Sequence, residues 1–118
     1  MKHKLIFMAL AILLYGCYDI EPMTPKQIYK NQLIQSCNKG NTQYCIELAE
    51  LIQKEDPNNA IQLYERACIS GYVKACIEAG DIFSEGQLIK KSNKNAKHFY
   101  GLACDLGSQI GCREFKHY

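Results

Sequence analysis

Seven cysteines are the residues of this 118-residue chain whose type and spacing could do chemistry. Six of them form three pairs in which the second cysteine lies eight positions after the first, and a glycine lies three positions after the first cysteine. The three sets are Cys37, Gly40 and Cys45; Cys68, Gly71 and Cys76; and Cys104, Gly107 and Cys112. Three copies of one spacing indicate an internal repeat. Zinc is the weaker interpretation, because zinc ligands usually lie two to four residues apart and no histidine spacing completes a site.

The spacing of each pair has a geometric consequence. Residues eight apart in one continuous helix are separated by about 12 Å of rise, whereas a disulfide needs Cα atoms about 4.4–6.8 Å apart. A helix that ends at a left-handed glycine and turns back can bring the two cysteines together. Each copy therefore predicts an αα-hairpin with a disulfide across its turn.

The rest of the chain supplies six helices for three such hairpins. Thr24-Pro25-Lys26-Gln27 has the pattern of a capping box with proline at the first helical position. No strand-like alternation occurs, so we expect an all-α domain, a short α-solenoid over residues 24–118. The helices are expected at about 25–37, after Gly40 through Ile52, 57–68, 73–83, 94–106 and from about 109 onward. Successive pairs begin 31 and 36 residues apart, a difference that falls in the longer connection at 85–93.

The start of the chain reads as an export signal. Lys2 and Lys4 precede an apolar run from Leu5 to Tyr15 that is too short for a spanning helix of about 20 residues. Leu14-Tyr15-Gly16-Cys17 resembles the lipobox of bacterial lipoproteins, in which the cysteine is acylated. An ordinary signal peptide with a chance cysteine is the alternative. We therefore expect a leader at 1–16 and a lipid-anchored tether at 17–23.

The cysteine count agrees with this interpretation. Seven is odd, and lipid on Cys17 leaves the three pairs. Export would place those pairs in an oxidising compartment of the bacterial cell envelope, where disulfides persist. Loss of Lys2 and Lys4 with the leader lowers the formal charge from +2 to zero. The whole-chain charge is then no argument for nucleic acid as a partner.

One stretch carries charge of a single sign. Lys90, Lys91, Lys94 and Lys97 occur with no acidic residue between Gln87 and Cys104. Such a run is usually a solvated loop and helix start. It could also contact anionic lipid headgroups or an acidic protein partner.

Two segments carry a family resemblance. Residues 80–86 (GDIFSEG) with 95–107 (NAKHFYGLACDLG), and residues 59–68 (NAIQLYERAC), resemble the Sel-one-like repeat (SLR) family, in particular its disulfide-bearing Hcp-type branch of exported bacterial proteins. The resemblance covers about residues 26–118. It implies TPR-like helical repeats that bind proteins, although some Hcp-type relatives are described as β-lactamases.

Candidate catalytic groups are few. Ser36 and Lys39 fit the S-x-x-K pattern of penicillin-recognising enzymes, but no K-T-G triplet accompanies them, and a lysine at a helix end is the plainer interpretation. His98 is expected to be a partly exposed helix residue. The recurring aromatics, expected in the core between helices, are Tyr29, Tyr64, Phe83, Phe99 and Tyr100.

We therefore expect a lipid-anchored protein–protein interaction module of the cell envelope, without a metal or cofactor, whose partner is a protein or peptide. A small tethered domain without chemistry would suit an immunity or exclusion lipoprotein. The alternative, carried by the resemblance alone, is a weak β-lactamase or β-lactam-binding protein.

Overall fold

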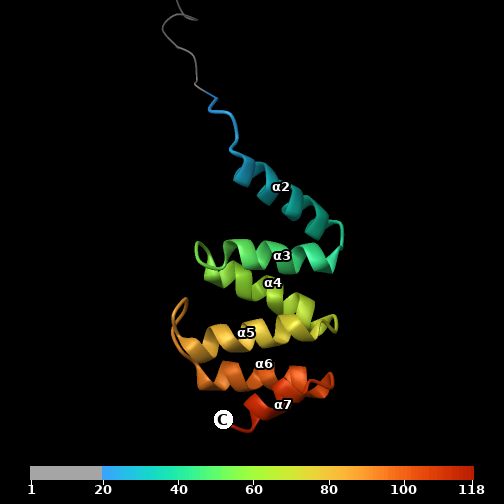
Figure 1. Cartoon of the computed structure of the whole chain (residues 1–118), viewed down its shortest axis with the longest axis vertical. Helices are drawn as coiled ribbons and strands as arrows, with labels where there is room; N and C mark the ends of the chain where they lie inside the picture. Colours follow the sequence, from blue (N-terminus) through green and yellow to red (C-terminus); the bar gives the residue numbers. More distant parts are fainter. Residues whose placement is uncertain (1–19) are drawn as a thin grey trace, which may run out of the picture.

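Residues 20–118 are described by a computed structural model, and this part of the chain is all-helical (Figure 1). The expected leader, Cys17 and the first part of the tether lie outside the described residues. No strand occurs in residues 20–118, so the all-α prediction is confirmed. The helices are α2 (Pro25–Asn38), α3 (Thr42–Ile52), α4 (Pro57–Ile69), α5 (Val73–Glu85), α6 (Asn93–Asp105) and α7 (Gln109–Phe115).

The ends of the helices follow from side chains that the sequence singles out. The Thr24 hydroxyl accepts a hydrogen bond from the Gln27 amide at 3.2 Å, and the Thr24 amide donates to the Gln27 side chain at 2.8 Å, which completes the expected capping box. Asp56 caps α4 and Ser92 caps α6 in the same way, each accepting from the amide three residues later. These caps satisfy amides that a helix leaves without an internal partner.

Each hairpin turn is built around a glycine with positive φ. Gly71 has a φ of 98°, and its amide donates to the Cys68 carbonyl at 2.9 Å while the Tyr72 amide donates to the Ala67 carbonyl at 3.1 Å. These two bonds are the Schellman pattern of a helix end. The same pair of bonds recurs at the other two turns, whose glycines are Gly40 and Gly107.

Disulfides join the two helices of every hairpin. The Cα atoms of the bridged cysteines lie 4.7, 4.7 and 4.4 Å apart, within reach of a disulfide. The pairs are the predicted ones, and they use all six cysteines of residues 20–118: Cys37–Cys45, Cys68–Cys76 and Cys104–Cys112.

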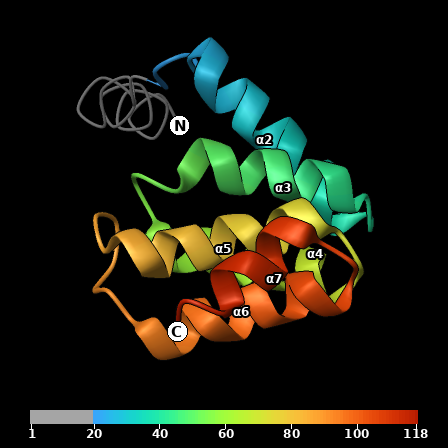
Figure 2. The ribbon, with the colours of Figure 1, turned by 60° about the horizontal axis from the view of Figure 1, so that its bottom comes forward.

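The hairpins stack in chain order into a short solenoid. Every helix packs against its neighbours in the sequence, and α4 also contacts α6 in the next hairpin. The three disulfide-bearing turns lie on one edge of the stack, and the connections between hairpins lie on the other (Figures 1 and 2). The first half of α2 diverges from the stack (Figure 1). The prediction of an α-solenoid of three stapled hairpins is confirmed.

Leucine, isoleucine, alanine and cysteine side chains make up most of the buried core, together with a few aromatic rings. Tyr64 and Tyr100, each four positions before a bridged cysteine, are buried. Phe99 is buried too, and its ring stacks on that of half-buried Phe83 with centroids 5.9 Å apart. The expectation for Tyr29 was wrong, because its side chain is 47% exposed. Tyr29 lies on α2, which packs against α3 and has no earlier helix beside it within the described residues.

Reduction of the three disulfides should leave the protein largely unfolded. By loop-closure entropy, each bridge contributes about 2.5 kcal/mol to the free energy of unfolding, and three of them match the whole net stability of a small domain, about 5–15 kcal/mol. A thermal melt followed by circular dichroism, with and without strong reductant, measures the loss. A cooperative and little-shifted melt of the reduced protein would contradict the expectation.

Replacement of Gly80 by alanine should lower the stability of the contact between α5 and α6. A Cβ atom at Gly80 would lie 2.6 Å from Cε1 of the buried Tyr100 ring, which has no space to retreat. We expect a loss of about 1–3 kcal/mol. Gly101→Ala is the matched control, because its Cβ would meet only the ring of exposed Phe115, at 3.1 Å. Denaturant unfolding of both variants tests the difference, and equal destabilisation would contradict it.

Candidate functional site

The lysine patch, consisting of Lys90, Lys91, Lys94 and Lys97, lies on the connection before α6 and on the first turns of that helix. All four side chains are exposed. None of them forms an ion pair with a carboxylate of residues 20–118, and no acidic residue occupies the first turn of α6. The Lys97 amine lies 5.0 Å from the centre of the Phe115 ring of α7, a cation–π distance.

The position of this patch has an electrostatic cost. The amino-terminal end of a helix carries a partial positive charge, so acidic residues are favoured there and lysines are disfavoured by about 0.3–1 kcal/mol at low ionic strength. Lys94, in the first turn of α6, is therefore disfavoured by the helix dipole, whereas Lys97, one turn later, has its contact with Phe115. Their charge remains available to a group outside the domain.

An acidic stripe, which was not anticipated from the sequence, runs along α5. Glu78 and Asp81 are half-buried and Glu85 is exposed. Lys74, one turn earlier, pairs with Glu50 of α3 at 2.6 Å and so extends the charged surface across two hairpins. The stripe could have been found from the sequence. Lys74, Glu78, Asp81 and Glu85 follow one another at intervals of four, three and four residues, and residues with this spacing share one face of a helix.

Burial changes the ionisation of the stripe. It is the largest cause that raises the pKa of Glu78, and the neighbouring Asp81 carboxylate is the next. The Tyr100 hydroxyl donates to Asp81 Oδ1 at 2.6 Å. Burial first, and then this bond, raise the pKa of the Tyr100 phenol well above its ordinary value, so the phenol stays protonated and keeps its hydrogen.

The Ser36–Lys39 pair shows none of the contacts of a catalytic dyad. Ser36 is half-buried on the last turn of α2, and its carbonyl accepts the amide of Asn41 at the turn. Lys39 is the exposed residue that ends the helix. No side-chain hydrogen bond joins these two residues, and neither lines one of the described surface hollows. The arrangement is that of a helix terminus.

Other candidate groups are exposed or structural. His98 is exposed on α6, with its ring edge-on to Phe99 at 5.2 Å between centroids. Residues 20–118 contain no group of three or more histidine, cysteine, aspartate or glutamate side chains that could hold a metal ion. Within the same residues, no helix has both the length and the apolar character to cross a bilayer.

An open hollow of about 330 Å³ lies between the start of α2 and the connection that precedes α4. Lys26 and Glu55 pair across it at 2.7 Å, and both are exposed. Exposed ion pairs of this kind contribute little to stability.

Fold and surface together define a disulfide-stapled α-solenoid that carries an exposed lysine patch and an acidic stripe. Comparison of the chain with protein-family models, curated proteins and solved structures finds no match.

Glu78→Gln should stabilise the protein at neutral pH. Because the folded state raises the pKa of Glu78, its contribution to stability is fully present below the ordinary pKa of 4.5 and is lost as the pH rises through the folded value. Glutamine cannot ionise, so the variant should melt higher than wild type at pH 7 and equally at pH 4.

Glu55→Gln is the control for this pH dependence. The Lys26 hydrogen bond lowers the pKa of Glu55, so its contribution is present at pH 7 and is lost in acid. This variant should melt no higher than wild type at pH 7. A Glu78→Gln protein that melts lower than wild type at pH 7 would contradict the assignment.

Proposed function

We propose that this protein is a lipid-anchored interaction module of the bacterial cell envelope, built from Sel-one-like repeats and without catalytic activity. The observation that carries the proposal is the lysine patch, four exposed lysines with no acidic partner in residues 20–118, one of which, Lys94, lies in the first turn of α6, where the helix dipole disfavours it. A partner with an acidic surface would recover the Coulomb energy that the fold forgoes.

The architecture supports a binding function. A stack of hairpins offers a continuous surface made of successive units rather than a closed cleft. The charged groups of this surface come from α3, α5, the connection after α5, and α6. An immunity or exclusion lipoprotein that neutralises a delivered effector is the form of this proposal that best suits a small tethered domain.

The envelope location rests on the cysteines. The six cysteines of residues 20–118 are paired with one another, which leaves Cys17 as the seventh of the sequence. Disulfides persist in oxidising compartments. Acylation of Cys17 would account for the odd number, and two or more acyl chains hold a protein to a bilayer without a spanning helix.

Photo-crosslinking of the full chain in the cells that produce it tests the proposal. The photoreactive residue p-benzoylphenylalanine at Asn95, which lies exposed within the lysine patch, should give one discrete protein adduct. Lys91→Gln with Lys94→Gln should remove most of it, whereas Lys39→Gln with Lys54→Gln should not, because those exposed lysines lie outside the patch. Cys17→Ser should release the protein from the membrane fraction.

Two outcomes would contradict the proposal. The first is an adduct of equal yield from Gln62, an exposed residue of α4 remote in sequence from the patch, which would indicate random collision. The second is turnover of a chromogenic β-lactam that Ser36→Ala abolishes, which would favour the hydrolase. Purified oxidised protein serves for that assay.

A further inference from the structure

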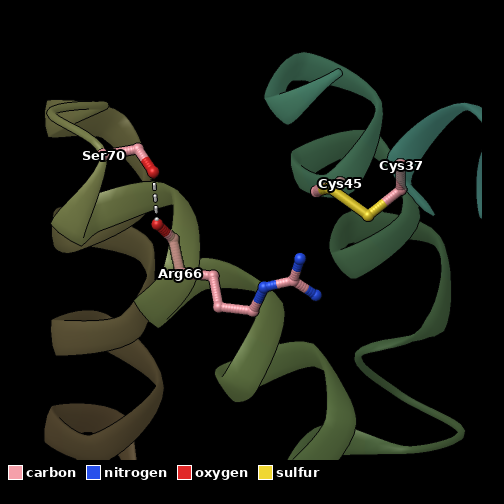
Figure 3. Close-up of a disulfide and its surroundings, with 4 residues drawn as sticks. All are labelled: Cys37, Cys45, Arg66 and Ser70. Carbon is pink, nitrogen blue, oxygen red and sulfur yellow. Dashed lines mark hydrogen bonds between the residues drawn. A yellow bond between two sulfur atoms is a disulfide. The ribbon is translucent and has the colours of Figure 1, made fainter. Parts of the chain in front are cut away.

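A small hollow lies between the first two hairpins, next to the first disulfide. Its volume is about 60 Å³. The Arg66 guanidinium of the second hairpin extends toward the Cys37–Cys45 bridge, whereas the Ser70 hydroxyl donates to the Arg66 carbonyl at 2.9 Å (Figure 3). We name this hollow the first slot, and its lining residues are Cys37, Gly40, Thr42, Cys45, Arg66, Ala67 and Ser70.

The first slot contains the cationic side chain of Arg66, which lies in the last turn of α4, where the helix dipole favours a positive charge. The Arg66 side chain extends from α4 toward the disulfide-bearing hairpin (Figure 3), and no carboxylate of residues 20–118 forms an ion pair with it. The other arginine of the chain, Arg113, pairs with Glu114 at 3.1 Å. Thr42, half-buried in the slot, likewise has no side-chain hydrogen bond within the described residues.

The repeat provides an internal comparison for the first slot. Successive repeats are 31 and 36 residues apart. Thr42 is therefore equivalent to Val73, Arg66 to Leu102 and Ser70 to Leu106. We name the equivalent position between the second and third hairpins the second slot, and its residues Val73, Leu102 and Leu106 are all apolar. Val73 and Leu102 are partly buried and pack against the core, whereas Leu106 is exposed.

The difference between the polar residues of the first slot and the apolar residues of the second bears on whether the first slot is needed for packing. In the second slot, Val73 and Leu102 add apolar surface to the core, and such burial stabilises by about 25 cal/mol per Å². Thr42 and Arg66 forgo that gain in the first slot. Packing between hairpins does not require them.

We propose that the first slot binds a carboxylate of the protein partner. The planar guanidinium of Arg66 donates two parallel hydrogen bonds, the arrangement that matches the two oxygens of a carboxylate. The Thr42 hydroxyl offers a further donor beside it. Phosphate recognition generally uses a cluster of arginines, whereas the slot contains a single arginine. This inference rests on the proposed interaction function and adds a second contact, on the disulfide edge of the stack.

The two arginines make the slot measurable by NMR, because each gives one Nε–Hε signal. At constant ionic strength, N-acetylglutamate α-amide should shift the Arg66 signal saturably at millimolar concentrations and leave Arg113 nearly unmoved. N-acetylglycylglycine, which carries only a terminal carboxylate, is the second arm. The arm with the lower dissociation constant identifies a side-chain or a chain-terminal carboxylate as the natural ligand.

Variants that carry the residues of the second slot complete the test. Thr42→Val keeps Arg66 and should weaken binding about threefold to tenfold, the loss expected for a hydrogen bond of about 0.5–1.5 kcal/mol. Arg66→Leu should abolish saturable shifts of the neighbouring Thr42 and Cys45 amides. Its remaining amide spectrum checks that the domain is folded.

Three results would overturn the carboxylate site. They are equal and unsaturable drift of both arginine signals, a stronger effect of inorganic phosphate than of either carboxylate, and unchanged binding in Thr42→Val. The small probes need no partner, so these results are independent of the crosslinking experiment. If no discrete adduct forms at Asn95 but the small carboxylates still bind, the lysine-patch interface is rejected and the carboxylate site of the first slot is supported.

Discussion

The reversal of the chain at a left-handed glycine, held by a disulfide, is the constraint on which the rest of this structure depends. The glycine lets each helix end with two hydrogen bonds from the turn back to its last carbonyls. The bridge then holds the returning helix against the first. Because the three turns have the same geometry, the three hairpins present equivalent faces and can stack in one direction.

Stacking in turn depends on how closely the helices approach. Alanines are buried on every helix from α3 to α6, and Gly80 leaves just enough space for the ring of Tyr100. A stack of three hairpins buries little apolar surface for its length, so close contact and covalent bridges share the stabilising role that a larger core has in bigger domains. The open end at α2 shows the consequence, because Tyr29 has no earlier helix to cover it.

Positions that differ between equivalent sites of the repeats are not constrained by the stacking of the hairpins, so they indicate residues that serve another function. The hairpins agree at their turn glycines and bridged cysteines. They disagree in the slots between hairpins, where Arg66 corresponds to Leu102, and in the connections, where the lysine patch has no counterpart in the first unit. Those disagreements lie on the surface. There they can change without disturbing the stack, and a partner can contact them.

The sequence by itself determined the hairpins, the disulfide pairs and the helix ends, because each depends on residues close together in the chain. Eight-residue spacing, a glycine after the first cysteine and a capping box are local signals with local geometry. Tertiary structure alone decided the exposure of Tyr29, the carboxylate that Tyr100 binds and the partial burial of Glu78.

The same division holds for the candidate site. The lysine patch could be read from consecutive residues, whereas the first slot joins residues more than twenty positions apart. Its significance appears only when the hairpins are stacked and their equivalent positions compared, because contact between hairpins brings Arg66 to the first disulfide.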